Sequence, residues 1–141
     1  MGVFNKLLKS GLTSNSNIKR KLVTVIMKAY YSSDISLDAS IAETVHFCHS
    51  GFGTVINPKS IIEENVTIQH RVTIGEKNPG GGAPLIKKGS YIGAGAIVLG
   101  DIIIGENSVI GAGSVVINSI PPNSVAVGSP AKIVRKVEGD L

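Results

Sequence analysis

Residues 85–116 read LIKKGSYIGAGAIVLGDIIIGENSVIGAGSVV, and this stretch decides the fold. An aliphatic residue recurs at every sixth position, and the same register extends back to position 56. The ten positions are Ile56, Ile62, Ile68, Ile74, Ile86, Ile92, Val98, Ile104, Ile110 and Val116. A period of six fits neither a helix nor a flat strand. It is typical of a parallel β-helix, in which a short strand and a turn repeat.

Small or β-branched residues stand four positions after most of these aliphatics, at Ser60, Val66, Val72, Ser90, Ala96, Ser108 and Ser114. We expect each aliphatic to point inward and stack on its equivalent one coil away, while the small residue turns the corner. A glycine often follows the aliphatic, as at Gly93 and Gly111, and we expect it to relieve backbone strain at the turn. With about 18 residues in a three-faced coil, residues 35–131 predict about five coils.

Two segments interrupt the repeat. At HFCHSGFG, residues 46–53, the register slips by three residues. At EKNPGGGAPL, residues 76–85, a Gly/Pro-rich loop replaces one hexapeptide. Because loops on a rigid scaffold tend to carry function, we expect the site at these interruptions. The glycines at 80–82 are not followed by the Lys-Ser/Thr pair of a phosphate loop, so we assign them no nucleotide-binding role.

The composition agrees with a thin repetitive stack. The 141 residues suffice for one domain, and 43% are hydrophobic but only 4% aromatic. The single cysteine, Cys48, excludes an internal disulfide framework. We see no signal peptide and no apolar run long enough to span a membrane, and we expect a cytoplasmic protein.

Residues 1–33 form a basic segment of different character. Residues 1–31 hold six basic residues and no acidic one, and apolar residues there recur at spacings of three and four. This pattern predicts two helices, the second from about Ile18 to Tyr31 with its cap in residues 13–17. Packing against the main domain or a neighbouring subunit is the favoured role, and contact with an anionic membrane is the alternative.

The main domain is predicted to span residues 34–135, followed by a tail at 136–141. Pro121 and Pro122 end the regular stack, and Val125 to Val127 predict a last strand. We expect the residues after the turn at 129–131 to form a short extension.

Four strings carry a family resemblance: DISLDASIAETVHFCHSG, VINPKSIIEENVTIQHRVTIG, YIGAGAIVLGDIIIGENSVIGAGSVV and IPPNSVAVGSPAKIVRK. Through them residues 34–135 resemble the hexapeptide-repeat acetyltransferases, in particular the serine acetyltransferase branch. The resemblance implies a left-handed parallel β-helix, a homotrimer, and acetyl-CoA as co-substrate in the groove between adjacent subunits. It implies no resident metal.

The resemblance also assigns residues. His49 matches the catalytic histidine, and Asp34, fifteen residues earlier, matches the aspartate that orients it. Gly75, Ala94 and Ala112 match positions beside the thioester and the pantetheine arm, and Lys132 and Arg135 match basic positions that meet the phosphates of coenzyme A. His70 stands where these enzymes usually have glutamine, and we expect it to bind the acceptor or to rival His49 as the base.

The chain departs from serine acetyltransferases around the acceptor. Cys48 replaces the aspartate before the histidine, and Gly82, Ala83 and Pro84 replace an Arg-His-Pro string. We also expect no counterpart of the N-terminal helical domain of that branch. The shorter architecture resembles O-acetyltransferases of capsule and exopolysaccharide biosynthesis, so we expect a carbohydrate hydroxyl as acceptor, with serine as the alternative.

Other functions have less support. A neutral histidine that removes the hydroxyl proton, with a carboxylate on its other nitrogen, is sufficient for direct acetyl transfer. Cys48 is expected at the substrate rather than as a nucleophile, and His46 is expected to be structural or at a subunit edge. Three histidines without an H-x4-H pair disfavour a zinc enzyme. A bare trimeric scaffold remains an alternative, and nucleic-acid binding lacks an aromatic platform.

Overall fold

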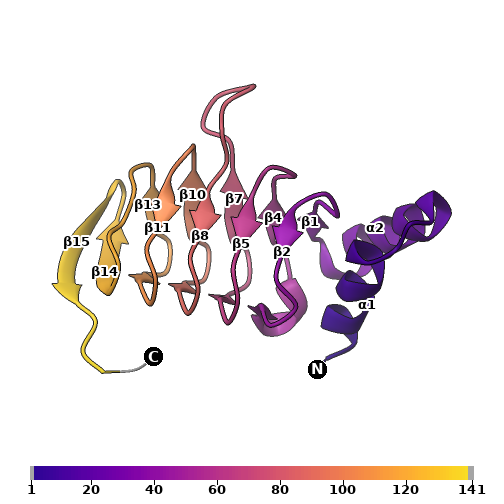
Figure 1. Ribbon diagram of the computed structural model, residues 1–141, viewed down its shortest axis with the longest axis horizontal. Coiled ribbons are helices and arrows are strands. Elements are labelled where there is room, and N and C mark those ends of the chain that lie inside the picture. The colour runs from indigo at the N-terminus through magenta and orange to yellow at the C-terminus, as the bar shows by residue number, and fades with distance from the viewer. Residues whose placement is uncertain (1, 140–141) are drawn as a thin grey trace.

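Two helices precede a three-sided stack of short parallel strands in the computed structural model, which describes residues 2–139 (Figure 1). Helix α1 spans Val3–Leu12 and helix α2 spans Asn17–Tyr31. The Ser16 hydroxyl accepts a hydrogen bond from the Lys19 amide at 3.4 Å and caps α2. Both predicted helices are therefore present, and the cap lies in the predicted segment.

Three parallel sheets make up the stack. Sheet A contains β1 (Asp34–Ile35), β4 (Val55–Ile56), β7 (Thr73–Gly75), β10 (Ile97–Leu99) and β13 (Val115–Val116). Sheet B contains β2 (Ser40–Ile41), β5 (Ile61–Ile62), β8 (Leu85–Ile86) and β11 (Ile103–Ile104). Sheet C contains β3 (His46–Phe47), β6 (Thr67–Ile68), β9 (Tyr91–Ile92), β12 (Val109–Ile110), β14 (Ser124–Gly128) and β15 (Ala131–Lys136).

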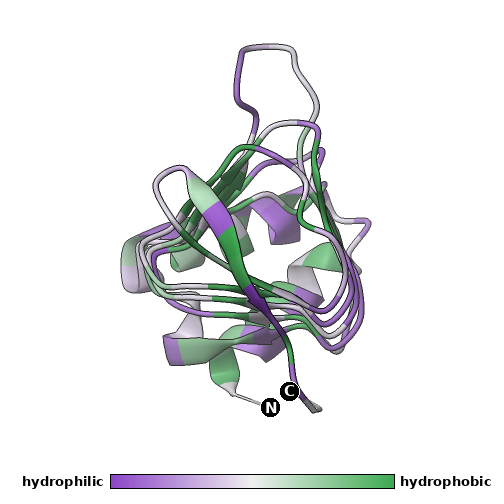
Figure 2. Cartoon of the chain, turned by 90° about the vertical axis from the view of Figure 1, so that its left-hand side faces the viewer, coloured by the Kyte–Doolittle hydropathy of each residue, from purple (hydrophilic) through white to green (hydrophobic). Residues whose placement is uncertain are grey.

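The chain visits sheets A, B and C in turn, so each coil contributes one strand to each side of a prism (Figure 2). The strands of neighbouring coils pair in parallel and in register, as Ile56 with Ile74 and Ile74 with Val98. Four coils are complete, and the B side of a fifth is the bridge between Ile104 and Ile120. The predicted left-handed parallel β-helix is confirmed.

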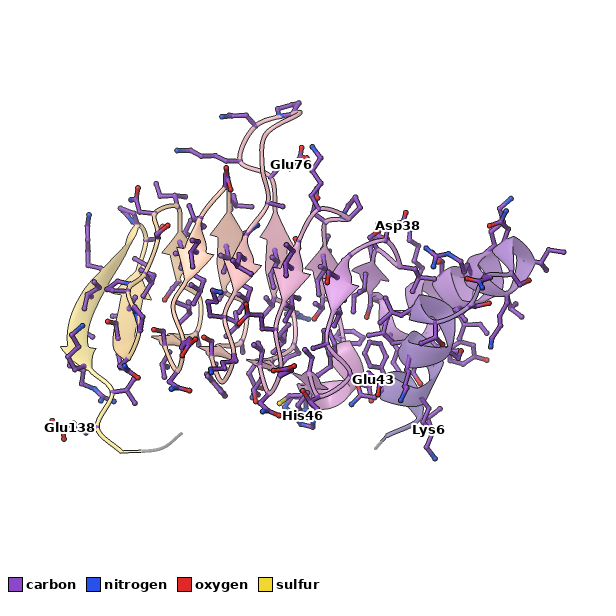
Figure 3. The ribbon with its side chains drawn as sticks, viewed as in Figure 1. Lys6, Asp38, Glu43, His46, Glu76 and Glu138 are labelled. Carbon is purple, nitrogen blue, oxygen red and sulfur yellow. The ribbon has the colours of Figure 1, made fainter. Side chains whose placement is uncertain are left out.

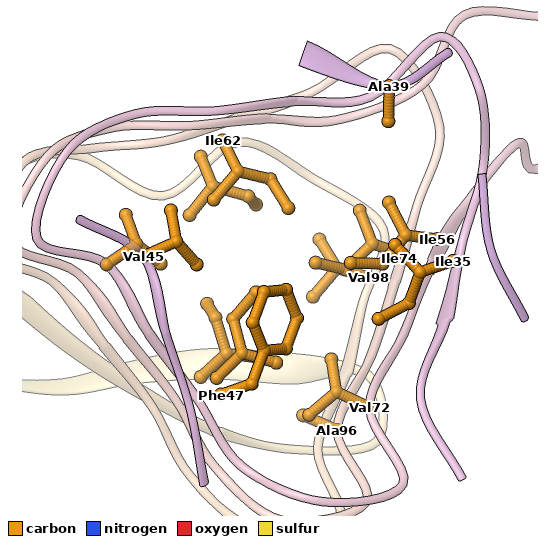
Figure 4. Packing of buried hydrophobic residues seen from close by; sticks show 14 of the residues in the cluster. Ile35, Ala39, Val45, Phe47, Ile56, Ile62, Val72, Ile74, Ala96 and Val98 are labelled. Atoms are coloured by element: carbon orange, nitrogen blue, oxygen red, sulfur yellow. The ribbon is translucent and has the colours of Figure 1, made fainter. Parts of the chain in front are cut away.

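The core is the stack of aliphatics that the six-residue period predicts. All ten repeat positions are at most 2% exposed. Figure 4 shows Ile35, Ile56, Ile74 and Val98 lying against one another along one side of the interior, with Val72 above Ala96 at a corner. Each buried aliphatic stabilises the fold by about 1.5–3 kcal/mol relative to an exposed one. The small corner residues are buried too, at most 1% exposed, so the corners belong to the core.

The C-terminal segment differs from its prediction. Strand β14 exceeds the predicted Val125–Val127 by one residue at each end, and the chain then turns back as β15. Val127 pairs with Lys132 in an antiparallel ladder. The expectation of a simple extension after the turn is wrong, because β15 satisfies the edge of sheet C. Of the predicted tail 136–141, residues 140 and 141 lie outside the described residues.

Neither helix among the described residues is long and apolar enough to cross a membrane.

Candidate active site

The register slip at residues 46–53 is an extra turn on one edge of the prism. We call this edge, where the chain passes from sheet C to sheet A at residues 48–54, 69–72, 93–96 and 111–114, the C/A edge. In the first of these passages Cys48–Gly51 form a short helical turn, η1, instead of the usual compact corner. His49 and Ser50 have left-handed backbone angles there, with φ of 50° and 55°. Strained residues of this kind cluster at functional sites.

His49 lies against His70 of the next coil. Their ring centroids are 4.9 Å apart with an interplanar angle of 84°, an edge-to-face contact. The His49 side chain belongs to an exposed residue, whereas His70 is half-buried and its Nδ1 is buried without a hydrogen-bond partner. Two imidazoles are thus in contact at the C/A edge, and one of them has a buried ring nitrogen without a hydrogen-bond partner.

Cys48 and Gln69 form a second pair beside the histidines. The Gln69 side-chain Nε2 donates a hydrogen bond to the Cys48 sulfur at 3.1 Å. Burial raises the pKa of the Cys48 thiol above its ordinary value. The thiol is therefore protonated at neutral pH, and a protonated thiol is a poor nucleophile. The predicted acceptor-side residues Cys48 and His70 are brought together with the predicted base, His49.

Ala94 and Ala112 continue the C/A edge below His70. The His70 carbonyl accepts a hydrogen bond from the Gly95 amide at 3.0 Å, and the Ala94 carbonyl accepts one from the Gly113 amide at 2.8 Å. A side chain added at Gly95 or Gly113 would meet nothing within 4 Å, so the space beside the backbone is open there. The surface of the C/A edge is therefore open at these two positions, which lie between the histidines and the C-terminal end of the prism.

Asp34 is paired with a lysine of the N-terminal segment. Its carboxylate faces Lys28 of α2, with the Lys28 Nζ 3.1 Å from an Asp34 oxygen, and both side chains are more than half exposed. No hydrogen bond joins Asp34 to His49 among the residues that the structure describes. Asp34 instead lines a groove of about 910 Å³ between α2 and sheet A.

Gly75 lines the same groove at the far end of β7. Its carbonyl accepts a hydrogen bond from the Gly100 amide at 2.9 Å. A side chain at this position would make only ordinary contacts, at 3.8 Å from Leu99 and 4.0 Å from Asn57. Because Gly75 ends β7 and the C/A edge precedes that strand, the length of β7 separates Gly75 from the C/A edge.

The loop at residues 76–84 leaves the prism at the edge between sheets A and B. The Lys59 Nζ is 2.6 Å from a Glu76 carboxylate oxygen and donates a hydrogen bond to the Gly81 carbonyl at 3.1 Å. The hydrogen bond from Lys59 lowers the pKa of Glu76 below the ordinary glutamate value. Glu76 lies on the upper side of the molecule and His46 on the lower side (Figure 3). The loop lies at the edge between sheets A and B, whereas His49 and His70 lie at the C/A edge of the same chain.

Lys132 and Arg135 lie on β15, and both are exposed. The Arg135 guanidinium donates to the Lys136 carbonyl at 3.2 Å, and Lys132 pairs with Val127 near the end of the C/A edge. The two bases sit on the last strand of sheet C, at the end of the prism far from His49 (Figure 1).

His46 is exposed at the start of β3. Within residues 2–139, no group of three or more His, Cys, Asp and Glu side chains is arranged to hold a metal ion.

The sequence did not lead us to two residues that contact predicted site residues: Gln69, which contacts Cys48, and Lys28, which contacts Asp34. The contact of Gln69 could have been predicted from the repeat, because Phe47 pairs with Ile68 in sheet C. The pairing places residue 69 beside 48 and residue 70 beside 49, a separation of 21 that a coil of 18 plus the slip of three predicts. Lys28 gave no such signal, since its contact depends on how α2 docks onto β1.

The chain is similar to bacterial hexapeptide-repeat transferases and to serine acetyltransferases. Residues 83–118 match the family described as bacterial transferase hexapeptide (six repeats). Serine acetyltransferase from Buchnera aphidicola is 40% identical over 129 residues, which cover 86% of this chain and 49% of that protein. Serine acetyltransferase from Escherichia coli K12 is 40% identical over 112 residues, 78% of this chain and 41% of that protein.

Solved structures agree. A serine acetyltransferase from Brucella abortus strain S19 in complex with coenzyme A superposes with a TM-score of 0.85 at 29% identity, covering 94% of this chain and 55% of that one. This chain spans about half the length of the relatives it matches. The likeness to hexapeptide-repeat acetyltransferases is thereby supported, and the finer likeness to capsule enzymes is not.

The expected carbohydrate acceptor is overturned by these relatives, which are named for serine. The expectation rested on replaced acceptor residues, Cys48 and the Gly82-Ala83-Pro84 string. Similarity across the rest of the chain outweighs two local departures.

Proposed function

We propose that this chain is an acetyl-CoA-dependent serine O-acetyltransferase with His49 as the general base. The observation that carries the proposal is the edge-to-face pair of His49 and His70. It lies on a strained turn at the head of an open edge, in a chain 40% identical to serine acetyltransferases. The turn is one of the two places where the hexapeptide register breaks.

His49 supports this role by its position. An exposed imidazole can approach a hydroxyl from solvent, remove its proton at a ring nitrogen, and later return that proton to the departing thiolate. Such general-base assistance is worth about 10²- to 10⁴-fold in rate. Direct transfer needs no covalent enzyme intermediate, in keeping with a Cys48 thiol that burial holds protonated.

The C/A edge suits acetyl-CoA by its shape. Open space flanks Gly95 and Gly113, and the small side chains of Ala94 and Ala112 leave backbone accessible to a narrow pantetheine arm. Lys132 and Arg135 supply positive charge at the far end for phosphate groups. Bound acetyl-CoA would supply the thioester carbonyl that the serine hydroxyl attacks.

His70, Cys48 and Gln69 are the proposed acceptor side of the site. The His70 Nδ1 without a partner and the Gln69 amide are hydrogen-bonding groups within the same cluster as His49. Asp34 is proposed to orient His49, which requires its carboxylate to exchange Lys28 for the imidazole. That exchange is inexpensive because an ion pair between two exposed side chains contributes at most about 1 kcal/mol.

A homotrimer is part of the proposal. Gly75 and the 76–84 loop follow β7 at the edge between sheets A and B, whereas His49 lies at the C/A edge, so we propose that they join the histidines from a neighbouring copy. A parallel arrangement of three prisms would place one C/A edge beside the groove of the next.

Release of coenzyme A from acetyl-CoA, measured with and without serine, tests the function. We expect serine-dependent release, and His49→Ala is expected to lower kcat about a hundredfold or more while coenzyme A still binds. Capsule-type oligosaccharides serve as the control acceptor. Absence of serine-dependent release from a folded protein that binds coenzyme A would overturn the proposal, and undiminished activity in His49→Ala would move the base to His70.

A further inference from the structure

We infer that the N-terminal helices position the His49 turn, with Phe4 and Ser33 as the positioning residues. This inference rests on the proposed function, because it assumes that the geometry of His49 limits the reaction. It assigns the helical segment a role in catalysis beyond covering the end of the prism.

The turn itself needs support from outside. His49, Ser50 and Gly51 take left-handed backbone angles in succession, with φ of 50°, 55° and 61°. For residues with a Cβ this conformation is unfavourable and persists only where the surroundings impose it. Within the turn, the Phe52 amide bonds the His49 carbonyl at 3.2 Å and the Thr54 amide bonds the Gly51 carbonyl at 3.0 Å. Neither bond fixes His49 against the adjacent coil.

Phe4 supplies the support from α1. A Cβ added to Gly51 would lie 2.7 Å from the Phe4 Cε1, so the ring lies directly against the Gly51 backbone. Phe4 is 2% exposed, and the rings of Tyr31 and Phe47 meet it edge-on at centroid distances of 5.0 Å and 5.7 Å. The aromatic cluster is wedged between α1, α2 and the turn. Three of the six Phe and Tyr residues of the chain thus form one cluster against the His49 turn.

Ser33 and Tyr31 tie the turn to the end of α2. The buried Ser33 hydroxyl donates a hydrogen bond to the Gly51 carbonyl at 2.7 Å. The Tyr31 carbonyl accepts one from the Gly53 amide at 3.0 Å. The next coil holds the two ends of the turn, because Gln69 donates to the Cys48 sulfur and the Arg71 amide donates to the Phe52 carbonyl at 2.7 Å. The backbone at Gly51 and Gly53, beside His49, is held by the Phe4 ring and by the two hydrogen bonds from Ser33 and Tyr31 of the N-terminal segment.

His49 depends on this support more than its neighbours do. Its side chain is exposed, and its recorded side-chain contact is with His70, so the backbone of the turn sets its direction. Loosening the turn displaces His49 relative to His70. It leaves Ala94 and Ala112 unchanged, because those residues lie in later coils.

Phe4→Ala and Leu8→Ala form a matched pair for the test. Both remove a buried side chain from α1, at 2% and 3% exposure, but Phe4 is the one that touches Gly51. We expect kcat to fall tenfold or more in Phe4→Ala relative to Leu8→Ala at unchanged KM for acetyl-CoA. Phe4→Leu is expected to restore part of the loss. Ser33→Ala is expected to lower kcat in the same way, with recovery in Ser33→Thr.

A second readout does not require activity. Cys48 is the single cysteine of the chain and begins the turn, so its rate of modification by a disulfide reagent reports how well the turn is held. We expect this rate to rise several-fold in Phe4→Ala and Ser33→Ala, and to stay near the parent value in Leu8→Ala. Circular dichroism verifies that each variant is folded.

The two proposals fail differently. A parent chain without serine-dependent activity but with the expected pattern of Cys48 modification would refute the function and leave the held turn standing. An active parent chain in which Phe4→Ala and Leu8→Ala lose equal activity and modify equally would refute the positioning role. Should Phe4→Ala not fold, equal kcat and equal modification in Ser33→Ala and the parent would refute it as well.

Discussion

Glycine serves two purposes in this chain: some glycines let neighbouring coils approach closely, and others take left-handed turn conformations. The prediction that the glycines after the buried aliphatics relieve strain at the turns is wrong. Gly93, Gly105 and Gly111 follow the buried aliphatics, but none of them has a left-handed backbone. At Gly93 a Cβ would lie 2.6 Å from the Ala112 amide nitrogen of the next coil. These glycines allow coils to approach closely. The strained turn positions lie elsewhere, at residues such as Gly95 and Asn107.

This distinction predicts different costs of substitution. Gly93→Ala forces a methyl group against the backbone of the next coil, and we expect it to lower the free energy of unfolding by about 3 kcal/mol. Gly95→Ala has open space and loses only the left-handed preference, about 1 kcal/mol. Urea unfolding at one fixed protein concentration measures both. Equal losses would contradict the close approach of coils as the reason for the glycine at 93.

Contacts between site residues were predictable from the sequence where the repeat sets them. They were not predictable where they depend on how helix α2 packs against the prism. The spacing of coils puts His70 beside His49, and the structure has the two rings in contact. Asp34 is paired with Lys28 of α2 and makes no hydrogen bond to His49 among the described residues, so its role of orienting His49 stays a prediction. Repeat spacing constrains neighbours along the prism. It carries no information about a helix packed outside it.

At the scale of elements, the six-residue repeat predicted the strands within it, and it did not predict the strand that follows it. Strands β4 to β13 follow from buried aliphatics six apart. Strand β15 pairs antiparallel with β14, and five of its six residues are exposed, so it has neither the period nor an alternating burial pattern. Its formation follows from the unpaired edge of sheet C, a consequence of the whole fold.

The loop at residues 76–84 is anchored by one ion pair, and its anchoring should depend on pH. Lys59 lowers the pKa of Glu76, so the contribution of the pair is fully present above the ordinary glutamate value and disappears as pH falls through the lowered value. The Gly80 amide donates to the Glu76 carboxylate at 3.2 Å and reports this titration by NMR. We expect a midpoint below the ordinary value.

Two lysine variants make that prediction specific. Lys59→Ala should raise the midpoint of the Gly80 amide shift toward the ordinary value, because the hydrogen bond that stabilises the carboxylate is lost. Lys77→Ala removes an exposed lysine of the same loop and should leave the midpoint in place. An unchanged midpoint in Lys59→Ala would mean that general loop charge, and not the Lys59 contact, sets the pKa.

At the scale of the whole molecule, the proposed site requires two copies of the chain, and mixed trimers can test this. One variant carries His49→Ala with an intact loop, and the other retains His49 but has the 77–83 loop shortened. Each homotrimer is expected to be inactive.

If a site takes its histidine from one copy and its loop from the neighbour, a random mixture of the two variants in equal amounts contains competent sites at about one quarter of all interfaces. Co-expressed variants should therefore recover serine-dependent activity near a quarter of the parent value, with light scattering giving the trimer mass. If mixed trimers form but recover no activity, the histidine and the loop of one site come from the same copy. If the loop variant is active by itself, the loop is not part of the site.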